Sequence, residues 1–343
     1  MRGKSFFSKI LIIRSHLLNI DQYIIDPERE YKKICENLDG TLIQIGPNSK
    51  TYINIFDIRE DSLEEGQGYL ENKISKLIGF FKLVFGNLDE EERAILEEKL
   101  IELYQSKGIT FEENSLYKKE KDTVNIKPVF KETTDMPTMG ELYELLGKDE
   151  KTKKMKIKLI PFVKGSLNFF NKHTNVELNN SLIVADVYDL GEDNLAYGMY
   201  LFTDFFWDKI KANRNKKKII YLDEAWRLIG VTSNKEVASF LYKIFKTIRK
   251  YGGSSIAITQ DISDIFSLEN GIYGKCILNN SSMKVFFELE EENIKILSEN
   301  TNLTEKEKIE IKSLKRGEAL IFANDNHVLI KIESANFEKE IIE

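Results

Sequence analysis

Lys218-Ile-Ile-Tyr-Leu-Asp223-Glu224 is the stretch of sequence that most restricts the fold. Apolar residues in a row, followed at once by two carboxylates, are typical of a buried parallel strand that ends in acidic side chains. Ligands of open α/β sheets bind at that carboxyl-terminal edge. Asp223 would hold Mg²⁺ there, directly or through water, and Glu224 would polarise a water molecule against a γ-phosphate. The same pattern also fits an ordinary strand that leads into a solvated helix start.

The first residues of the chain supply a partner for such an acidic strand. Gly3-Lys4-Ser5 opens a run of apolar residues at helical spacing, from residue 4 to 19. This is how a phosphate-binding loop of the form G-x-x-x-x-G-K-[ST] ends: the lysine reaches the β- and γ-phosphates and the hydroxyl ligates Mg²⁺. Gly3 would be the second glycine of that loop. We therefore expect the first strand and the start of the loop to lie ahead of residue 1.

A third polar side chain follows the next strand along the chain. The run Ser254-Ser-Ile-Ala-Ile-Thr-Gln260 ends in an amide that can hydrogen-bond a γ-phosphate or the attacking water. Between the two strands we expect a helix over residues 236–250, with an inner stripe formed by Leu241, Ile244, Phe245 and Ile248. Its last turn carries Arg249, which either complements the helix dipole or acts as an arginine finger towards a neighbouring subunit's nucleotide.

The order of apolar runs predicts an α/β fold with a mostly parallel sheet covered by helices on both faces. A helix is expected over residues 28–38. Residues 62 to about 175 have helical periodicity, with a loop around Tyr117–Lys131, which predicts an α-helical insertion. The last two strand-like runs flank Asn324-Asp325-Asn326, as in an antiparallel hairpin. The expected strands are Tyr23–Ile25, Thr41–Ile45, Tyr52–Ile58, Leu182–Val187, Ile219–Leu222, Ser255–Ile258, Met283–Phe287, Ala319–Phe322 and His327–Ile332.

Composition excludes several classes of protein. With 343 residues, 42% of them hydrophobic and 31% charged, the chain is typical of one large globular domain or two modest ones. No run approaches the roughly 18 apolar residues of a membrane span, and the first residues lack the features of a secretory signal. Its two cysteines are too few for a disulfide framework and have no metal-ligand spacing, which fits a reducing cytoplasm.

Two basic runs stand out against a net charge of −6. They cover residues 209–218 and 151–158. Lysines at helix ends and in loops are usually solvated, and a DNA contact is the alternative. Salt-dependent DNA binding that weakens when Lys216, Lys217 and Lys218 are neutralised would favour the alternative.

Five motifs in series resemble the motor domain of the conjugal-transfer ATPases of type IV secretion systems, within the wider HerA/FtsK and TraG-like P-loop group. The motifs are Ile25-Asp-Pro-Glu-Arg-Glu-Tyr31, Tyr52-Ile-Asn-Ile-Phe-Asp-Ile58, Tyr221-Leu-Asp-Glu-Ala-Trp226, Arg249-Lys-Tyr-Gly-Gly253 and Ile258-Thr-Gln-Asp261. The resemblance implies a RecA-like core in two parts, residues 1–60 and 179–343, around an all-α insertion over residues 61–178. It also implies ATP and Mg²⁺ as cofactors and a homo-oligomer, often a hexamer. That oligomer would be docked with other secretion subunits at the cytoplasmic face of a membrane channel.

The resemblance assigns a role to each candidate residue. It assigns catalysis to Glu224, sensing of the phosphate to Gln260, and action in trans on a neighbouring subunit's nucleotide to Arg249. Asp223 and Ser5 hold the metal. Nucleotide contacts are assigned to Gly3, Lys4, Ser5, Phe6, Glu28 and Arg316. The acidic residues of the Asp26–Tyr31 segment otherwise read as caps of the helix that follows, and Arg316 otherwise reads as part of a solvated turn.

Two alternatives remain at this point. Met1-Arg2 stands where the family has small residues, and the family's first strand and N-terminal domain are missing. The chain therefore also fits a catalytically impaired subunit with an assembly role. The other alternative is a DNA-pumping coupling protein or a HerA/FtsK-type translocase, which the basic runs favour and the acidic net charge opposes.

Overall fold

The computed structural model describes residues 3–63, 68–86, 88–118, 129–148, 152–224, 235–260, 262–266, 271–324 and 326–343. The chain divides into two compact units. The first unit comprises Met1–Leu42, Leu178–Asp186 and Arg214–Glu343, and the second comprises Ile43–Glu177 and Val187–Asn213. The expected all-α insertion falls inside the second unit up to Glu177, and this unit also includes flanking residues on both sides. The division into 1–60, 61–178 and 179–343 stays a prediction.

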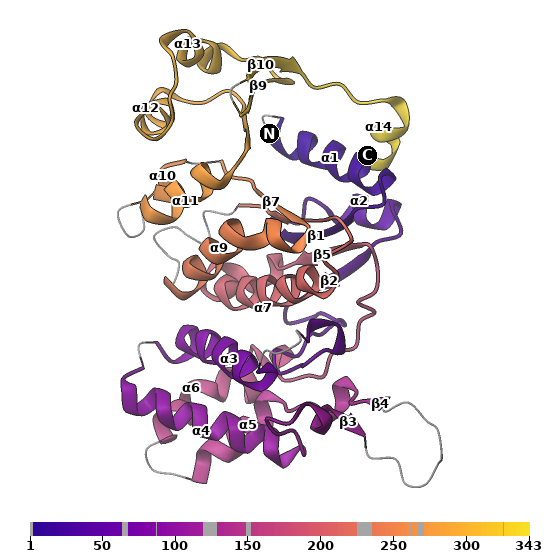
Figure 1. The fold of residues 1–343 in the computed structure, drawn as a ribbon, viewed down its shortest axis with the longest axis vertical. Helices are drawn as coiled ribbons and strands as arrows, with labels where there is room; N and C mark the ends of the chain where they lie inside the picture. The colour runs from indigo at the N-terminus through magenta and orange to yellow at the C-terminus, as the bar shows by residue number, and fades with distance from the viewer. Residues whose placement is uncertain are drawn as a thin grey trace. The chain divides into compact units, whose positions relative to one another are not determined.

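A five-stranded sheet forms the centre of the first unit (Figure 1), in the order β2-β5-β1-β6-β7. The pairs β1–β5, β1–β6 and β6–β7 are parallel. Every residue of β5 is buried, as expected for a parallel strand covered on both faces. The bounds are β1 (Asp21–Asp26), β2 (Thr41–Gln44), β5 (Leu182–Asp186), β6 (Lys218–Leu222) and β7 (Gly253–Ala257). All five strands were predicted, and the parallel sheet is confirmed.

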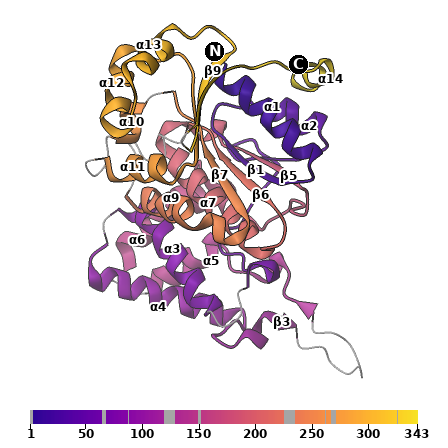
Figure 2. The ribbon, with the colours of Figure 1, turned by 45° about the horizontal axis from the view of Figure 1, so that its top comes forward.

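Two helices from the start of the chain lie against this sheet (Figure 2): α1 (Lys4–Leu17) packs on β1, and α2 (Lys32–Asn37) packs on β5. Their shared core contains Ile12, Ile13, Tyr31 and Tyr221. Helix α2 begins four residues later than predicted, because the Asp26 carboxylate accepts hydrogen bonds from the backbone of Glu30 and Tyr31 and holds them in a turn. The unit's other helices are α9 (Lys235–Thr247), with a 3-10 turn η8 (Ile248–Tyr251), α10 (Ile262–Phe266), α11 (Ile272–Asn280), α12 (Glu291–Asn300), α13 (Glu305–Ser313) and α14 (Asn336–Ile342).

The predicted terminal hairpin is confirmed and gains a third strand. Strands β9 (Glu318–Ala323) and β10 (Asn326–Lys331) pair antiparallel, and β8 (Met283–Phe286) pairs antiparallel with β9. Phe286 and Phe322 meet edge to face and pack with Leu297 of α12 and Ile311 of α13. This small sheet therefore has its own hydrophobic core.

The second unit is largely helical, as predicted. A cluster of rings, including Phe80, Phe162, Phe170 and Tyr197, fills its interior. In the region predicted as a loop, β3 (Tyr117–Lys118) pairs antiparallel with β4 (Val129–Phe130). The helices are α3 (Tyr69–Phe85), α4 (Glu90–Ser106), α5 (Met139–Leu145), α6 (Lys153–Lys164) and α7 (Gly191–Ala212), joined in places by 3-10 turns. Within the described part of the chain, no helix is both long and apolar enough to cross a membrane.

The strand predicted over Tyr52–Ile58 is wrong. The amides of Tyr52 and Asn54 donate to the side chains of Asn175 (2.8 Å) and Thr174 (2.8 Å). The Asn54 side chain then accepts from the amide of Phe56 at 3.1 Å. The apolar residues of this segment are buried, as they would be in a strand. These three backbone amides donate to side chains, among them those of Thr174 and Asn175 more than a hundred residues away, and not to a neighbouring strand.

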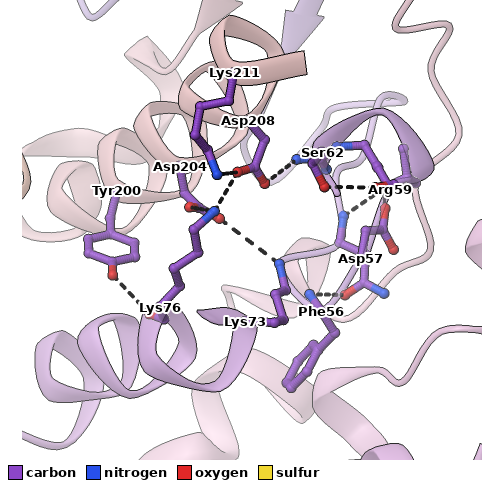
Figure 3. Close-up of polar contacts among 12 residues, drawn as sticks. Phe56, Asp57, Arg59, Ser62, Lys73, Lys76, Tyr200, Asp204, Asp208 and Lys211 are labelled. Atoms are coloured by element: carbon purple, nitrogen blue, oxygen red, sulfur yellow. Dashed lines mark hydrogen bonds and ion pairs between the residues drawn. The ribbon is translucent and has the colours of Figure 1, made fainter. Parts of the chain in front are cut away.

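A buried charged cluster joins three elements of the second unit (Figure 3): the loop before α3, α3 itself and α7. Lys76 lies 2.5 Å from Asp208 and 2.7 Å from Asp204, and Arg59 lies 3.1 Å from Asp208. Burial alone would raise the pKa of Asp208, but Lys76, Arg59 and Lys211 lower it to about 2. Burial lowers the pKa of Lys73 to about 8. The charges of this cluster compensate one another in a place that water does not reach, so loss of one partner would leave the others buried without compensation.

Replacing Asp208 with Ala should destabilise the chain by about 3–5 kcal/mol, because the substitution leaves the cations of the cluster buried without their shared partner. The measurement is urea unfolding at neutral pH. Because the pKa of Asp208 is depressed, its contribution is present above the usual carboxyl pKa and should be lost as the pH falls towards about 2. Glu333→Ala, which breaks an exposed pair with Lys331, is the control and should leave stability close to that of the wild type. Equal effects of the two substitutions would contradict this account of the cluster.

Candidate active site

The carboxyl ends of three adjacent strands each carry a buried aspartate. Asp186 ends β5, Asp26 ends β1 in register with it, and Asp223 follows β6. The amide of Asp223 still donates to the carbonyl of Ile25 at 3.3 Å, so this carboxylate lies at the same edge of the sheet. All three aspartates are at most 5% exposed. Sequence reasoning missed Asp186 as a site residue, although Leu182-Ile-Val-Ala-Asp186 repeats the pattern that singled out Asp223.

Asp26 shapes the turn that follows β1. Its carboxylate accepts from the amide of Glu30 at 3.0 Å and from that of Tyr31 at 2.9 Å. Both amides precede Lys32, the first residue of α2, so Asp26 fixes the turn ahead of the helix and the predicted capping of the helix itself is not seen. Burial raises the pKa of Asp26 to about 6, although these amide hydrogen bonds oppose the shift. The neighbouring Asp186 raises it further. The edge thus concentrates negative charge that the surrounding protein only partly compensates.

The acidic pair after β6 is tied to the glutamine after β7. The Gln260 side-chain amide donates to the Glu224 carboxylate at 2.7 Å, and the amide of Glu224 donates to Asp223 at 3.0 Å. Glu224 has a φ of 47°, a backbone conformation that is unfavourable for a glutamate. Burial raises the pKa of Asp223 to about 7, opposed by the nearby Tyr31 hydroxyl, while the Glu224 and Asp26 charges add to the shift. A strained acid and a carboxyl with a raised pKa at one edge are typical of functional sites.

Lys4, at the start of the chain, also lies at this edge of the sheet. Its ammonium donates to the carbonyl of Thr259, next to Gln260, at 2.9 Å. Ser5 lies in the first turn of α1 and is half-buried. The lysine, the acidic pair and the glutamine, which are distant in the sequence, therefore meet at the ends of β6 and β7.

Gly3 lies where the sequence required a glycine. Its φ is 86°, and a Cβ atom there would lie 3.1 Å from the ring of Phe287. The same Cβ position is 4.0 Å from the amide of Gly317, so the turn that contains Arg316 lies beside the start of α1. The Arg316 side chain is exposed, Phe6 is 36% exposed, and Glu28 is half-buried in the turn after β1.

Arg249 lies elsewhere. It is exposed in η8, which precedes β7, whereas Gln260 follows β7. Arg249 is therefore at the opposite edge of the sheet from the lysine, the acidic pair and the glutamine of its own chain. This position excludes a contact with the nucleotide of its own chain at that edge, and complementing the helix dipole and acting in trans both stay predictions. Trp226, the last residue of one of the five motifs, lies outside the described residues.

The basic run over residues 209–218 is largely compensated within each unit. In the second unit, Lys209 lies 2.6 Å from Asp61. In the first unit, Lys216 lies 2.7 Å from Asp21, and Lys218 is buried with its ammonium donating to the carbonyl of Tyr251. These contacts weaken the case for DNA binding by this run.

The donor set suits Mg²⁺ held together with a nucleotide. Among the described residues, no group of three or more His, Cys, Asp or Glu side chains is placed to hold a metal ion by itself. Mg²⁺ usually takes one or two protein oxygens and completes its shell with phosphates and water. The Ser5 hydroxyl and the Asp223 carboxylate are oxygen donors of this kind, so the residues present fit the ion.

Comparison with known proteins identifies the family. The model of the TraG P-loop domain matches residues 2–339. The chain belongs to the TraG P-loop domain family. The structure of VirB4 from Thermoanaerobacter pseudethanolicus superposes with a TM-score of 0.84 at 30% identity, covering 99% of this chain and 88% of that one. This match confirms the predicted RecA-like P-loop fold.

Two further relatives are more distant. Protein TraC of Escherichia coli K12 is 23% identical over 280 residues, which are 76% of this chain and 28% of TraC. This chain thus spans just over a quarter of that protein. The plasmid coupling protein TrwB, solved in complex with ADP and Mg²⁺, shares the fold with a TM-score of 0.62 at 14% identity over 98% of this chain and 84% of that one.

Replacing Asp223 with Asn should stabilise the chain at alkaline pH when nucleotide and Mg²⁺ are left out. Because the pKa of Asp223 is raised, ionising this carboxyl costs stability as the pH rises from about 4 to about 7. Asparagine avoids that cost, so its advantage over the wild type should grow by about 1–3 kcal/mol between pH 5 and pH 8. Urea unfolding at the two pH values measures it. Asp39→Asn, at an exposed position, should show no comparable pH dependence, and a flat difference for Asp223→Asn would contradict the assignment.

Proposed function

We propose that this chain is the ATP-hydrolysing motor domain of a type IV secretion or conjugative transfer system, powering substrate transfer or pilus assembly. The observation that carries the proposal is the meeting of Lys4, Glu224 and Gln260 at one edge of a parallel sheet. Membership of the TraG P-loop family and the likeness to VirB4 support it.

Each residue at the edge has a role in this proposal. Lys4 binds the β- and γ-phosphates of ATP, while Ser5 and Asp223 would hold Mg²⁺. When bound, the ion withdraws negative charge from the phosphates. Glu224 orients a water molecule and accepts its proton as the γ-phosphate is attacked in line. Gln260, hydrogen-bonded to Glu224, couples the position of that base to the presence of a γ-phosphate.

Further contacts complete the proposed nucleotide site. Gly3 allows the close approach of the backbone to phosphate, and Phe6, Glu28 and Arg316 surround the nucleotide. Arg249 faces a neighbouring subunit's nucleotide, which requires a homo-oligomer, a hexamer by family resemblance. The partners are other secretion subunits at the inner face of a membrane channel, with the motor in the cytoplasm and peripheral to the membrane.

Replacing Glu224 with Gln should abolish turnover and preserve ATP binding. The amide keeps the size of the side chain but cannot accept a proton, and general base catalysis contributes about 10²–10⁴-fold to rate. Phosphate release measures kcat, and calorimetry with ATP and Mg²⁺ measures affinity, both on the polypeptide that carries this domain.

Glu305→Gln, at a position whose side chain is 86% exposed, is the matched control and should leave both quantities unchanged. Turnover close to wild type in Glu224→Gln would remove this residue from the mechanism. If the wild-type protein bound no ATP at all, the assembly role without catalysis would replace the motor proposal.

A further inference from the structure

Two residues at the carboxyl edge of the sheet have a backbone conformation that their side chains disfavour. Among the described residues, five that are not glycine have a positive φ. Three of these are asparagine or aspartate, which tolerate the left-handed region. The other two are Glu224 (φ 47°), just after β6, and Arg29 (φ 57°), just after the adjacent strand β1. Such strain persists only where surrounding contacts enforce it, and it gathers at functional sites.

An ion pair with a buried aspartate enforces the conformation of Arg29. Its Nε lies 2.7 Å from Oδ2 of Asp186, whose side chain is fully buried, while the Arg29 side chain is 32% exposed. Asp186 is the register partner of Asp26, so Arg29 pairs with one of two carboxylates that lie on neighbouring strands. A buried charge pair of this kind is costly to break from one side only.

The turn that Arg29 anchors ends at Tyr31. The amides of Glu30 and Tyr31 both donate to Asp26, so the turn is fixed at two points, through Asp186 and through Asp26. Tyr31 is 0% exposed and packs in the core with Ile12 of α1. Its hydroxyl lies near Asp223, and burial together with the charge of that carboxylate raises the pKa of the Tyr31 phenol. Tyr31 shares this core with Tyr221 of β6, so contacts run from Asp186 through the turn to the strand that Asp223 follows.

We propose that Arg29 is a positioning residue for ATP hydrolysis. Its ion pair with Asp186 holds the Pro27–Tyr31 turn, and the turn holds the Tyr31 ring in the core beside β6, the strand that Asp223 follows. Arg29 thereby sets the orientation of Asp223 without touching the nucleotide. The inference rests on the proposed function, because that function gives Asp223 its role.

The test compares a broken pair with a neutralised one. Arg29→Gly removes the guanidinium and accepts a positive φ without strain. The double variant Arg29→Gln with Asp186→Asn removes both charges and keeps hydrogen-bonding groups that can tie the turn to β5. Asp39→Gly relieves the same backbone conformation at an exposed position before β2 and is the control.

Two readouts are needed. In nucleotide-free protein, hydrogen exchange at the amides of Glu30 and Tyr31 should be at least about tenfold faster in Arg29→Gly and near the wild-type rate in the double variant. In turnover, Arg29→Gly should lower kcat by about tenfold or more with KM for ATP within about threefold, and the double variant should recover most of kcat. The Asp39→Gly control should change neither readout.

Unchanged exchange and unchanged kcat in Arg29→Gly would overturn the inference. So would a double variant with wild-type exchange and the low kcat of Arg29→Gly, because the guanidinium would then act on the nucleotide itself. The proposed function fails separately, if the wild type hydrolyses no ATP or if Glu224→Gln is as active as the wild type. The exchange measurement still tests the anchored turn in that case.

Discussion

Three buried carboxylates at the ends of adjacent parallel strands are the constraint on which the candidate site depends. Each carboxylate interacts with a different group of the protein. Asp186 has the guanidinium of Arg29 at 2.7 Å, and Asp26 has two backbone amides within 3.0 Å. Asp223 has the amide of Glu224 and the nearby Tyr31 hydroxyl, and burial raises its pKa to about 7, compared with about 6 for Asp26. The aspartate that is compensated least by the protein is thus the one best suited to gain from a bound cation.

The second unit shows that buried carboxylates need not mark a site. Asp208 is as buried as Asp223, yet its pKa lies at about 2 because lysines and an arginine surround it. That pattern is typical of a structural ion network, in which the native state favours the charged form. At the sheet edge the charged form of Asp223 is disfavoured, and the acid that follows it has a strained backbone. The pKa of Asp208 is lowered and that of Asp223 is raised, so the direction of the shift separates these two buried carboxyls.

Much of the sheet could be predicted because each buried parallel strand is a short apolar run. The carboxylate directly after one of these runs also predicted Asp223 as a site residue. Apolar residues alone did not distinguish a strand from the irregular Tyr52–Ile58 segment. The side chains that hydrogen-bond its backbone, Thr174 and Asn175, are far away in the sequence. Arg29 had no signal either, since its left-handed conformation and its partner, 157 residues away, arise only from tertiary structure. The position of Arg249 could be predicted, because Arg249 precedes β7 and Gln260 follows it, so the two residues lie at opposite ends of one parallel strand.

The most direct test of the central claim is a crystal structure of the protein with Mg²⁺ and a non-hydrolysable ATP analogue. The account predicts the β- and γ-phosphates at the Lys4 ammonium, with the ion held by the Ser5 hydroxyl and, directly or through water, by Asp223. It also predicts Gln260 and Glu224 at the γ-phosphate. Nucleotide bound away from the carboxyl ends of β6 and β7, or phosphates that contact none of these side chains, would contradict it.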